Sequence, residues 1–561
     1  VLPFSLLSCR IEFASSLSSS ILSIASTHTH STNSLAGIGR QPTMNRTSLL
    51  TTHLHKALSI TDTAYDGVIV VSHSAAALAA CPQLQQLSPA VEKYLELNRT
   101  ANHSACVIPV DKSLLPSGRL IYAGTGIVSR DYDDVRRFGH AARDALKLAL
   151  GAGVKHPLLV TVPHKNFPQA ELVSALGALQ PAYIPLHVKD DEPEKQTLAS
   201  FGVLPVGDST SRLLEILEAM DEAFTVTRDI GETGPERMAP PKVAAYLEKA
   251  FAGSKSVKLI ITDDQAVIEK EYPLMAAVNR SANTVERHRA RHIRLEYQGE
   301  GEVQATYYLV GKGVTLDTGG CDLKVGGSMW GMCRDKYGAA VVAGFFKALE
   351  KLQPKNIKVV GQLGVVRNSI GSNAYSCDEI ITSRSGKRIH IYNTDAEGRL
   401  VMLDPLTKAC EEAQTAVNPH LMTVATLTGH EVLTYGYYAS FMDNGPAKRD
   451  GLSAAIQKAG DEFGQPIEIT RLHHEDFAFH LPDSGAAAHL RQGNTKPSVQ
   501  TVRGHMGPAA FLIQGSRLDE HGLDSSSPIP FTHVDMGSCE GEHPHTSYPN
   551  PLVALVAGLV I

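Results

Sequence analysis

The segment Asn393–Leu400 reads NTDAEGRL and places Asp395, Glu397 and Arg399 at alternate positions. It follows the strand-like run RIHIY, and loops at the carboxyl ends of strands are where open α/β sheets form ligand sites. We therefore expect the two acids to project into a common crevice. Two interpretations stay open for this segment alone. One is a metal or catalytic site, and the other is a turn into a helix, where acids favour the helix dipole.

A second group of polar residues lies upstream. The run Val310–Gly320, VGKGVTLDTGG, carries Lys312 and Asp317 in what we expect to be a glycine-rich loop, and Lys324 follows it. Asp335 lies in the segment MCRDKYGAA, just before a helical pattern. Four carboxylates gathered without a cation would repel one another strongly. Two metal ions ~3.5–4 Å apart, bridged by carboxylates, remove that repulsion and form a common hydrolytic site.

The elements that must position these residues alternate between strand-like and helical patterns, which predicts an α/β fold. Expected strands are 65–72, 120–123, 158–162, 257–262, 306–310, 357–365, 389–392 and 421–427. Expected helices are 134–150, 213–224, 242–251, 339–352 and 400–413. A run with three prolines and two glycines, RDIGETGPERMAPP, predicts a linker between two α/β units.

This pattern predicts two domains. A smaller N-terminal α/β domain spans 62–225, a linker and helix span 226–252, and a larger catalytic domain spans 253–561. We expect the catalytic domain to contain a central mixed sheet flanked by helices. Every candidate site residue falls in this larger domain.

Composition narrows the functional classes. The chain has 561 residues, of which 43% are hydrophobic and 20% charged, which is ample for a large core. A net charge of −6 argues against nucleic-acid binding, which favours a basic stripe. The eight cysteines include no C-x-x-C pair and are too sparse for a disulfide scaffold, which indicates a reducing intracellular compartment. No apolar run reaches the ~20 residues of a membrane-spanning helix, so we expect no membrane association.

Residues 1–61 hold a single acid, Glu12, among many serines and threonines. We expect a disordered leader here, and two interpretations stay open. It is an acid-poor organellar transit segment, or it is upstream sequence translated in error, with Met44 as the true start. The expected location is cytoplasmic, and organellar if residues 1–43 are a genuine transit segment.

Together these motifs resemble the leucyl aminopeptidase (cytosol aminopeptidase) family of dinuclear metallopeptidases. That family has a GKG-x-x-x-D-[ST]-GG run, a lysine seven residues after its Asp, a D-x-x-GAA segment and NTDAEGRL. All four are present here in the same order and spacing. The motif region covers Val310–Gly429, and weaker similarity extends over about 225–561.

The resemblance implies a set of metal ligands. One ion would be held by Lys312, Asp317, Asp335 and Glu397, and the other by Asp317, Asp395 and Glu397. The ions would be Zn²⁺, Mn²⁺ or Mg²⁺, and Lys312 would bind as a neutral amine.

It also implies further roles. Lys324 would polarise the scissile carbonyl or stabilise the oxyanion, and Arg399 would hold a bicarbonate ion as proton shuttle. The substrate side chain would be lined by Met332, Thr426, Leu427 and Gly429. The substrates would be peptides, cleaved after their N-terminal residue with a broad, Leu-type preference, by a homohexamer.

The sequence departs from the family pattern at several positions. The segment DKYGAA places Lys336 and Tyr337 beside Asp335, Trp330 lies in the same region, and HVDMGS (His533–Ser538) stands where the family has a DIAG-like stretch. Two other functions stay open: a structural protein without catalysis, and a nucleic-acid-binding regulator. The intact set of ligand positions argues against the first, and the net charge of −6 argues against the second.

Overall fold

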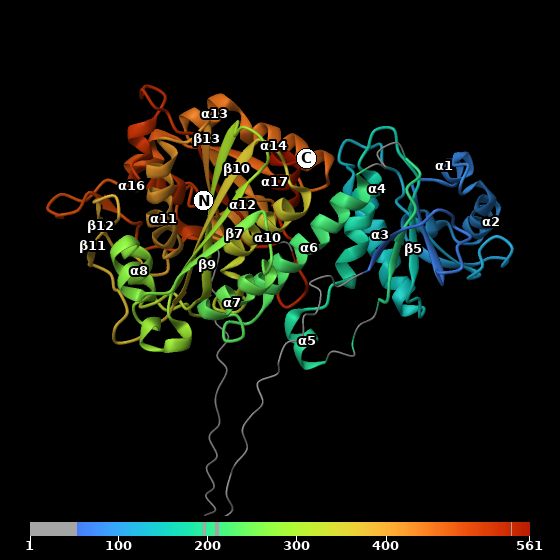
Figure 1. Ribbon diagram of the computed structural model, residues 1–561, viewed down its shortest axis with the longest axis horizontal. Helices are drawn as coiled ribbons and strands as arrows, with labels where there is room; N and C mark the ends of the chain where they lie inside the picture. Colours follow the sequence, from blue (N-terminus) through green and yellow to red (C-terminus); the bar gives the residue numbers. More distant parts are fainter. Residues whose placement is uncertain (1–52, 193–194, 196–197, 208–211, 540) are drawn as a thin grey trace, which may run out of the picture. The chain divides into compact units, whose positions relative to one another are not determined.

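The structure is a computed structural model that describes residues 53–561 except 193–194, 196–197, 208–211 and 540 (Figure 1). Most of the predicted leader, residues 1–52, lies outside the described residues. Its last part is not a leader, because Leu54–Lys56 form strand β1, paired in parallel with Phe201–Val203. The partner strand lies about 150 positions away, so a three-residue strand left no local pattern in the sequence.

The first part of the chain forms a six-stranded sheet with the strand order β1-β6-β5-β2-β4-β3. All neighbours are parallel except β3 and β4. The remaining strands are β2 (Gly67–Ser72), β3 (Ala105–Pro109), β4 (Arg119–Gly124), β5 (Pro157–Thr161) and β6 (Phe201–Val203). The helices of this part are α1 (Ala75–Ala80), α2 (Ser88–Leu97), α3 (Arg136–Gly151), α4 (Ala170–Leu179), α5 (Leu186–Asp191) and α6 (Leu213–Glu232).

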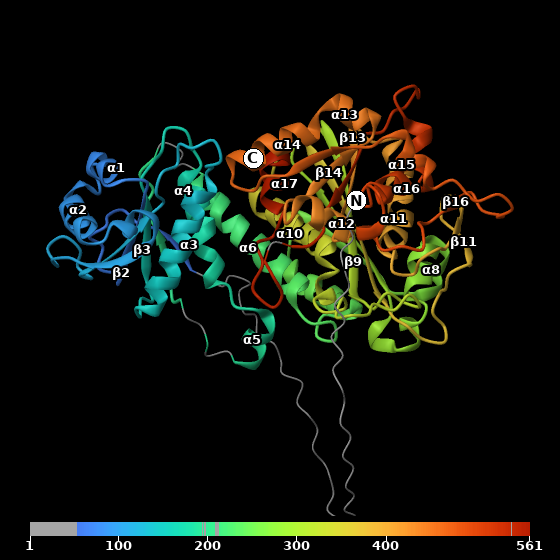
Figure 2. The same cartoon turned by 180° about the vertical axis from the view of Figure 1, so that it is seen from behind.

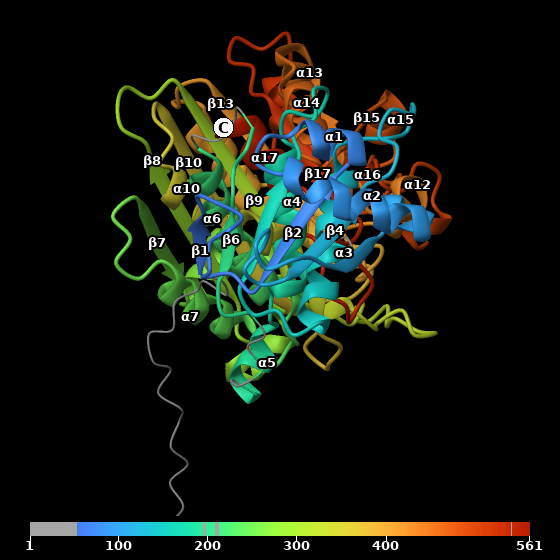
Figure 3. The same ribbon diagram turned by 90° about the vertical axis from the view of Figure 1, so that its right-hand side faces the viewer.

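The second part is built around an eight-stranded mixed sheet with the order β15-β14-β17-β13-β9-β10-β8-β7. Its centre, β17-β13-β9-β10, is parallel, and antiparallel pairs occur at β10/β8, β8/β7 and β17/β14. The strands are β7 (Val257–Thr262), β8 (Arg291–Gln298), β9 (Ala305–Asp317), β10 (Ile357–Asn368), β13 (Pro419–Ala425), β14 (Ser440–Asp443), β15 (Glu468–Arg471) and β17 (Phe531–Asp535). Figure 3 shows β7, β8, β10 and β9 side by side.

Helices cover both faces of this sheet. Along β9, Leu309 belongs to one core cluster, while Tyr308 and Val310 belong to another. The first cluster includes α10 (Tyr337–Leu352), and the second includes α11 (Gly398–Ala413). Side chains alternate across a strand, so a sheet with both faces buried is apolar at nearly every position. The fold is therefore α/β, with a mixed sheet flanked by helices, as the sequence predicted.

The remaining elements surround this sheet. A three-stranded sheet has the order β11-β12-β16 and consists of β11 (Ile380–Thr382), β12 (Arg388–His390) and β16 (Leu490–Arg491). The other helices are α7 (Pro240–Ala250), α8 (Gln265–Glu271), α9 (Pro273–Asn279), α12 (Gly429–Tyr435), α13 (Gly445–Asp450), α14 (Leu452–Glu462), α15 (His474–Ala478), α16 (Gly507–Gly515) and α17 (Leu552–Leu559). Helices α11 and α16 lie next to each other (Figure 2).

Two predicted elements differ from the structure. The predicted linker begins too early, because Arg228–Glu232 is the buried last part of α6, which ends just before Gly234 and Pro235. The expected glycine-rich loop around Lys312 is the second half of β9. Its glycines permit close packing, since a Cβ on Gly311 would lie 2.7 Å from Cα of Ala339 in α10. The domain boundaries themselves stay predictions.

Across the described part of the chain, the structure contains no helix both long and apolar enough to cross a membrane.

Candidate metal and active site

Lys312 and Asp317 both come from β9, the strand between β13 and β10. They are five positions apart, so a regular strand would point them to opposite faces. Val314 pairs with Val366 while Asp317 pairs with Asn368, so β9 takes three steps where β10 takes two. This β-bulge adds one residue and brings Asp317 to the face that Lys312 occupies.

Asp335 and Glu397 meet at the amine of Lys312. Lys312 Nζ donates to Asp335 Oδ1 at 2.7 Å and to the carbonyl oxygen of Thr426 at 2.8 Å, and it lies 2.9 Å from Glu397 Oε1. Asp335 precedes α10, and Glu397 is the N-cap residue immediately before α11. A Cβ on Gly398 would lie 2.7 Å from Cε of Lys312, so only glycine lets α11 start this close to β9.

Lys324 forms ion pairs with the other two carboxylates, those of Asp317 and Asp395. Its Nζ lies 2.9 Å from Asp317 Oδ2 and 2.5 Å from Asp395 Oδ1. Asp317 is buried, whereas the side chain of Asp395 is 30% exposed. The four acids and two lysines therefore form one continuous cluster, which extends from a buried end at Asp335 to a more open end at Asp395.

The four carboxyl groups of this cluster outnumber its two lysines, so the acids that no lysine neutralises favour binding a proton. Burial lowers the pKa of Lys312, but Asp335 and Glu397 outweigh it, so the pKa lies above the usual lysine value. Burial and the neighbouring Asp317 raise the pKa of Asp395 to about 7. Burial also raises the pKa of Asp335 well above its usual value, against the attraction of Lys312. Two lysines cannot neutralise four carboxylates in a low-dielectric site.

The donor set fits divalent cations. Oxygen atoms of Asp317, Asp335 and Glu397 lie within 4.8 Å of one another, and all three residues are buried. Asp335 Oδ2 is buried and has no hydrogen-bond partner among the described residues. Carboxylate oxygens suit Mg²⁺ and Mn²⁺, and Zn²⁺ accepts oxygen and nitrogen ligands. An unpaired, buried carboxylate oxygen beside two other acids is a position that a cation would satisfy.

Residues that the sequence analysis missed hold the acids in place. Asn368 Nδ2 donates to Asp317 Oδ1 at 2.8 Å and to the carbonyl oxygen of Thr394 at 3.0 Å. The hydroxyl oxygen of Thr394 accepts from the backbone amide of Asp322 at 2.8 Å, and the backbone amide of Thr394 donates to Asp322 Oδ2 at 2.7 Å. These bonds join the end of β10 and the segment after β9 to the loop of Asp395. Their partners are 26 to 72 residues apart, so no local pattern indicated them.

Arg399 lies in the first turn of α11 and is 8% exposed. Its Nη1 donates to the carbonyl oxygen of Gln492 at 2.9 Å, while its Nε has no partner among the described residues. Burial lowers the pKa of Arg399 to about 10, although Glu397 and Asp535 favour the charged form. Gln492 also donates to the carbonyl oxygens of Asn393 and Ala396, and so fixes the NTDAEGRL loop. Arg399 is thus a buried cation with a free donor.

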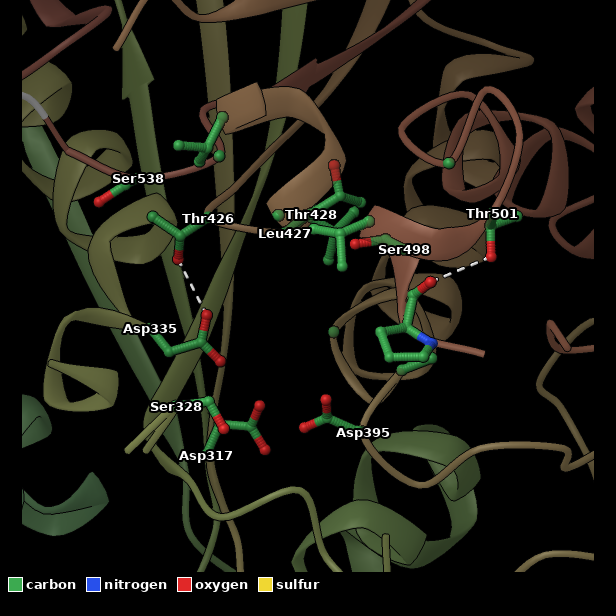
Figure 4. Close-up of a pocket in the computed structure, with 18 of the residues that line it drawn as sticks. Asp317, Ser328, Asp335, Asp395, Thr426, Leu427, Thr428, Ser498, Thr501 and Ser538 are labelled. Atoms are coloured by element: carbon green, nitrogen blue, oxygen red, sulfur yellow. Dashed lines mark hydrogen bonds between the residues drawn. The ribbon is translucent and has the colours of Figure 1, made fainter. Parts of the chain in front are cut away.

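A cavity of about 970 Å³ contains this cluster, and its lining includes every residue proposed for the site from sequence. We call Lys312, Asp317, Lys324, Asp335, Asp395 and Glu397 the acidic wall. We call Met332, Thr426, Leu427, Thr428, Gly429, Val432, Gly537 and Ser538 the side-chain wall. Figure 4 shows Asp317 and Asp395 across the cavity from Leu427 and Thr428, and Thr426 hydrogen-bonded to Asp335.

The structure shows where two residues that depart from the family pattern lie. Lys336 points away from the acids, because its buried Nζ donates to the carbonyl oxygens of Thr233, at 2.8 Å, and Cys333. Burial lowers its pKa to about 8. Trp330 is 71% exposed at the rim of the cavity, with its ring 4.9 Å from that of His543. Lys336 therefore does not occupy the site, and Trp330 borders its entrance.

Comparisons with known proteins show the family to which this chain belongs. Residues 225–553 match the model of the cytosol aminopeptidase family, catalytic domain. A putative aminopeptidase of Caenorhabditis elegans is 62% identical over 522 residues, which cover 92% of this chain and 99% of that protein. A probable cytosol aminopeptidase of Chlamydia muridarum is 33% identical over 402 residues, covering 70% of this chain and 74% of that protein.

Solved structures share the fold at low sequence identity. Leucyl aminopeptidase from Trypanosoma cruzi has a TM-score of 0.75 and 19% identity, covering 91% of this chain and 96% of that one. The bottromycin maturation enzyme BotP in complex with Mn has a TM-score of 0.71 and 20% identity, covering 88% of this chain and 98% of that one.

Proposed function

We propose, because the chain belongs to the cytosol aminopeptidase family of peptide hydrolases, that it releases N-terminal amino acids from peptides with a broad, Leu-type preference. Family membership confirms the resemblance that the motifs indicated. The observation that carries the proposal is the acidic wall, in which oxygens of Asp317, Asp335 and Glu397 lie within 4.8 Å of one another at the amine of Lys312. Such a set, buried in a cavity of about 970 Å³, suits metal-dependent hydrolysis.

We propose two divalent ions for this wall, Zn²⁺, Mn²⁺ or Mg²⁺. One would be held by Lys312, Asp317, Asp335 and Glu397, and the other by Asp317, Asp395 and Glu397. When bound, the ions would lower the pKa of a water molecule and neutralise the acids. Lys312 would then serve as a neutral amine, because a neighbouring cation disfavours its charged form.

Two cations of the chain have separate tasks in this proposal. Lys324 points its amine at Asp317 and Asp395, and would donate to the scissile carbonyl oxygen as negative charge develops there. Arg399 has a free Nε donor and would hold a bicarbonate ion that accepts and returns the proton of the attacking water. Met332, Thr426, Leu427 and Gly429 would contact the side chain of the departing residue.

Assembly and location are also proposals. The family resemblance supports a homohexamer that acts in the cytoplasm. No contact among the described residues favours a structural or nucleic-acid-binding role over hydrolysis.

The proposal is tested with purified protein and leucine anilide. After preincubation with Mn²⁺, we expect turnover that EDTA abolishes and fresh Mn²⁺ restores. A folded, metal-loaded protein that turns over neither leucine anilide nor a panel of dipeptides would refute the aminopeptidase function. It would instead support a structural role.

A further inference from the structure

Behind the side-chain wall lies a buried acid that the proposed chemistry does not use. Glu431 is in α12, next to Val432 and two residues after Gly429, both of which line the cavity. Its side chain is 0% exposed, and neither carboxyl oxygen has a hydrogen-bond partner among the described residues. Leaving a buried polar group unpaired costs ~1–3 kcal/mol, and more for a charged group. A purely structural acid would have acquired a donor.

The carboxyl group lies directly against the cavity lining. A Cβ built on Gly537 would lie 1.9 Å from Glu431 Oε2, so the acid occupies the space that any side chain at this position would need. Gly537 itself lines the cavity. A residue without a side chain is thus the layer between the acid and the substrate space. The carboxyl has no hydrogen bond to break when it turns towards a cationic group in the cavity.

The neighbouring acid, Asp535, has the hydrogen-bond donors that Glu431 lacks among the described residues. Thr428 Oγ1 donates to Asp535 Oδ2 at 2.7 Å, and the Gly537 amide donates to Asp535 Oδ1 at 2.8 Å. Donors on both sides of Glu431 are therefore already directed at Asp535. Burial, and then the charge of Asp535, raise the pKa of Glu431 to about 10. Without a cation nearby, Glu431 stays protonated at neutral pH.

We propose that Glu431 is a specificity-determining residue, which fits the side-chain wall to substrates whose N-terminal residue is arginine or lysine. The inference rests on the proposed aminopeptidase function and adds a cationic class to the apolar residues that the same wall accepts. A guanidinium or ammonium group would provide the counter-charge and the donors that Glu431 lacks.

The rest of the wall suits such a side chain. Met332 and Val432 are apolar and can cover the methylene stem of arginine or lysine. Thr426, Thr428 and Ser538 also line the cavity, and hydroxyl oxygens can accept the donors that a guanidinium does not direct at the carboxylate. Arginine carries five donors in a planar fork, so it should gain more than lysine.

The test compares arginine, lysine and leucine anilides with the Mn²⁺-loaded, full-length protein. We expect the wild type to hydrolyse arginine anilide with a kcat/KM at least equal to that for leucine anilide. Glu431→Gln keeps the shape but cannot carry charge, and should lower the arginine value roughly 30-fold or more. Its leucine value should stay within about twofold, because an apolar side chain does not use the charge. Glu431→Leu should show the same pattern.

Controls separate this inference from folding effects and from the proposed function. Glu269→Gln makes the same charge change at an exposed position of α8, and should leave the arginine-to-leucine ratio unaltered. If the wild type cleaves leucine anilide and both Glu431 variants retain that turnover, a constant arginine-to-leucine ratio overturns the role of Glu431 alone. If the wild type cleaves no anilide at all, the proposed function and this inference fall together. If Glu431→Gln fails to fold, Glu431→Leu decides, because it removes the buried polar group altogether.

Discussion

Asp317, in the acidic wall, and Glu431, behind the side-chain wall, are buried acids with opposite sets of partners. In the acidic wall, Asp317 accepts from the Gly319 amide at 2.9 Å and from Asn368 at 2.8 Å, and it lies 2.9 Å from Lys324. Behind the side-chain wall, Glu431 is equally buried, yet neither of its oxygens has a partner among the described residues. Asp317 lines the cavity and Glu431 lies directly behind its lining, so burial alone does not explain the difference.

The comparison shows what each wall is built to bind. Acids that are oriented in advance by fixed donors pay little reorganisation when a cation arrives, which is the arrangement expected of metal ligands. An acid without donors is instead neutral until a mobile cation reaches it. The acidic wall is therefore suited to a resident ion, and the side-chain wall to a charge that enters with the substrate.

The largest effect should follow from removing a ligand of the acidic wall. Glu397→Gln keeps the size of the side chain but loses its charge, so we expect the kcat/KM for leucine anilide to fall on the order of 10³-fold, about 4 kcal/mol. The bound metal per protomer, measured by mass spectrometry of the element, should fall as well. Glu269→Gln on α8 is the matched control. Unaltered metal content and turnover would show that the acidic wall is not the metal site.

Metal removal should also affect stability. Ions that bind only the folded protein stabilise it by about 2.7 kcal/mol at a concentration 100 times the dissociation constant. We expect EDTA to lower the midpoint of thermal unfolding and Mn²⁺ or Zn²⁺ to raise it, and we expect Glu397→Gln to reduce this response. If neither the chelator nor the metal changes the midpoint of thermal unfolding, metal binding does not explain why the acids are clustered.

A smaller effect should come from the donor that orients Asp317. Asn368→Ala removes the bonds to Asp317 Oδ1 and to the Thr394 carbonyl, but it removes no ligand. Loss of such an outer partner typically costs about 10–100-fold in metal affinity or activity. Titration with Mn²⁺ should show a higher concentration for half-maximal turnover, with recovery at saturating metal. A deficit that saturating metal cannot restore would mean that Asn368 acts otherwise.

The smallest effect should be the change in the free energy of unfolding when Glu431 is replaced. Glu431→Leu replaces an unpaired acid by an apolar group of similar size, and we expect stabilisation of about 1–3 kcal/mol at neutral pH. Thermal unfolding monitored by circular dichroism checks the direction. A destabilised Glu431→Leu would mean that the acid has a structural partner after all.

The difference in stability between Glu431→Leu and the wild type should depend on pH, in a direction that the pKa of Glu431 sets. Glu431 has a pKa of about 10 in the folded protein, against an ordinary value of 4.5. The folded state therefore binds more protons, and its contribution to stability is complete below about pH 4.5 and declines as the pH rises towards 10. The advantage of Glu431→Leu over the wild type should thus grow between pH 5 and pH 9. An advantage that stays constant would contradict the raised pKa.

Local sequence was sufficient for much of this molecule. Continuous apolar runs with strand length predicted β2, β5 and β7, and the 3.6-residue period predicted α3 and α10. The motifs around Lys312, Asp335 and Asp395 indicated the family and named the acids, because spacing and residue type are properties of the chain itself. Strand β8 alternates Ile293, Leu295 and Tyr297 with charged residues, a period-two pattern that favours a strand but was overlooked beside the continuous apolar runs.

Only the tertiary structure decided how those residues face one another. A one-residue bulge against β10 sets the face of Asp317, and the pairing of two strands is not visible in either one. Asp317 accepts from Asn368, which is 51 positions away, and Arg399 donates to the carbonyl oxygen of Gln492, which is 93 positions away. Glu431 looked like an ordinary helix residue. Its significance comes from the absence of a hydrogen-bond partner among the residues that the structure describes and from the contact with Gly537, which a sequence pattern cannot contain.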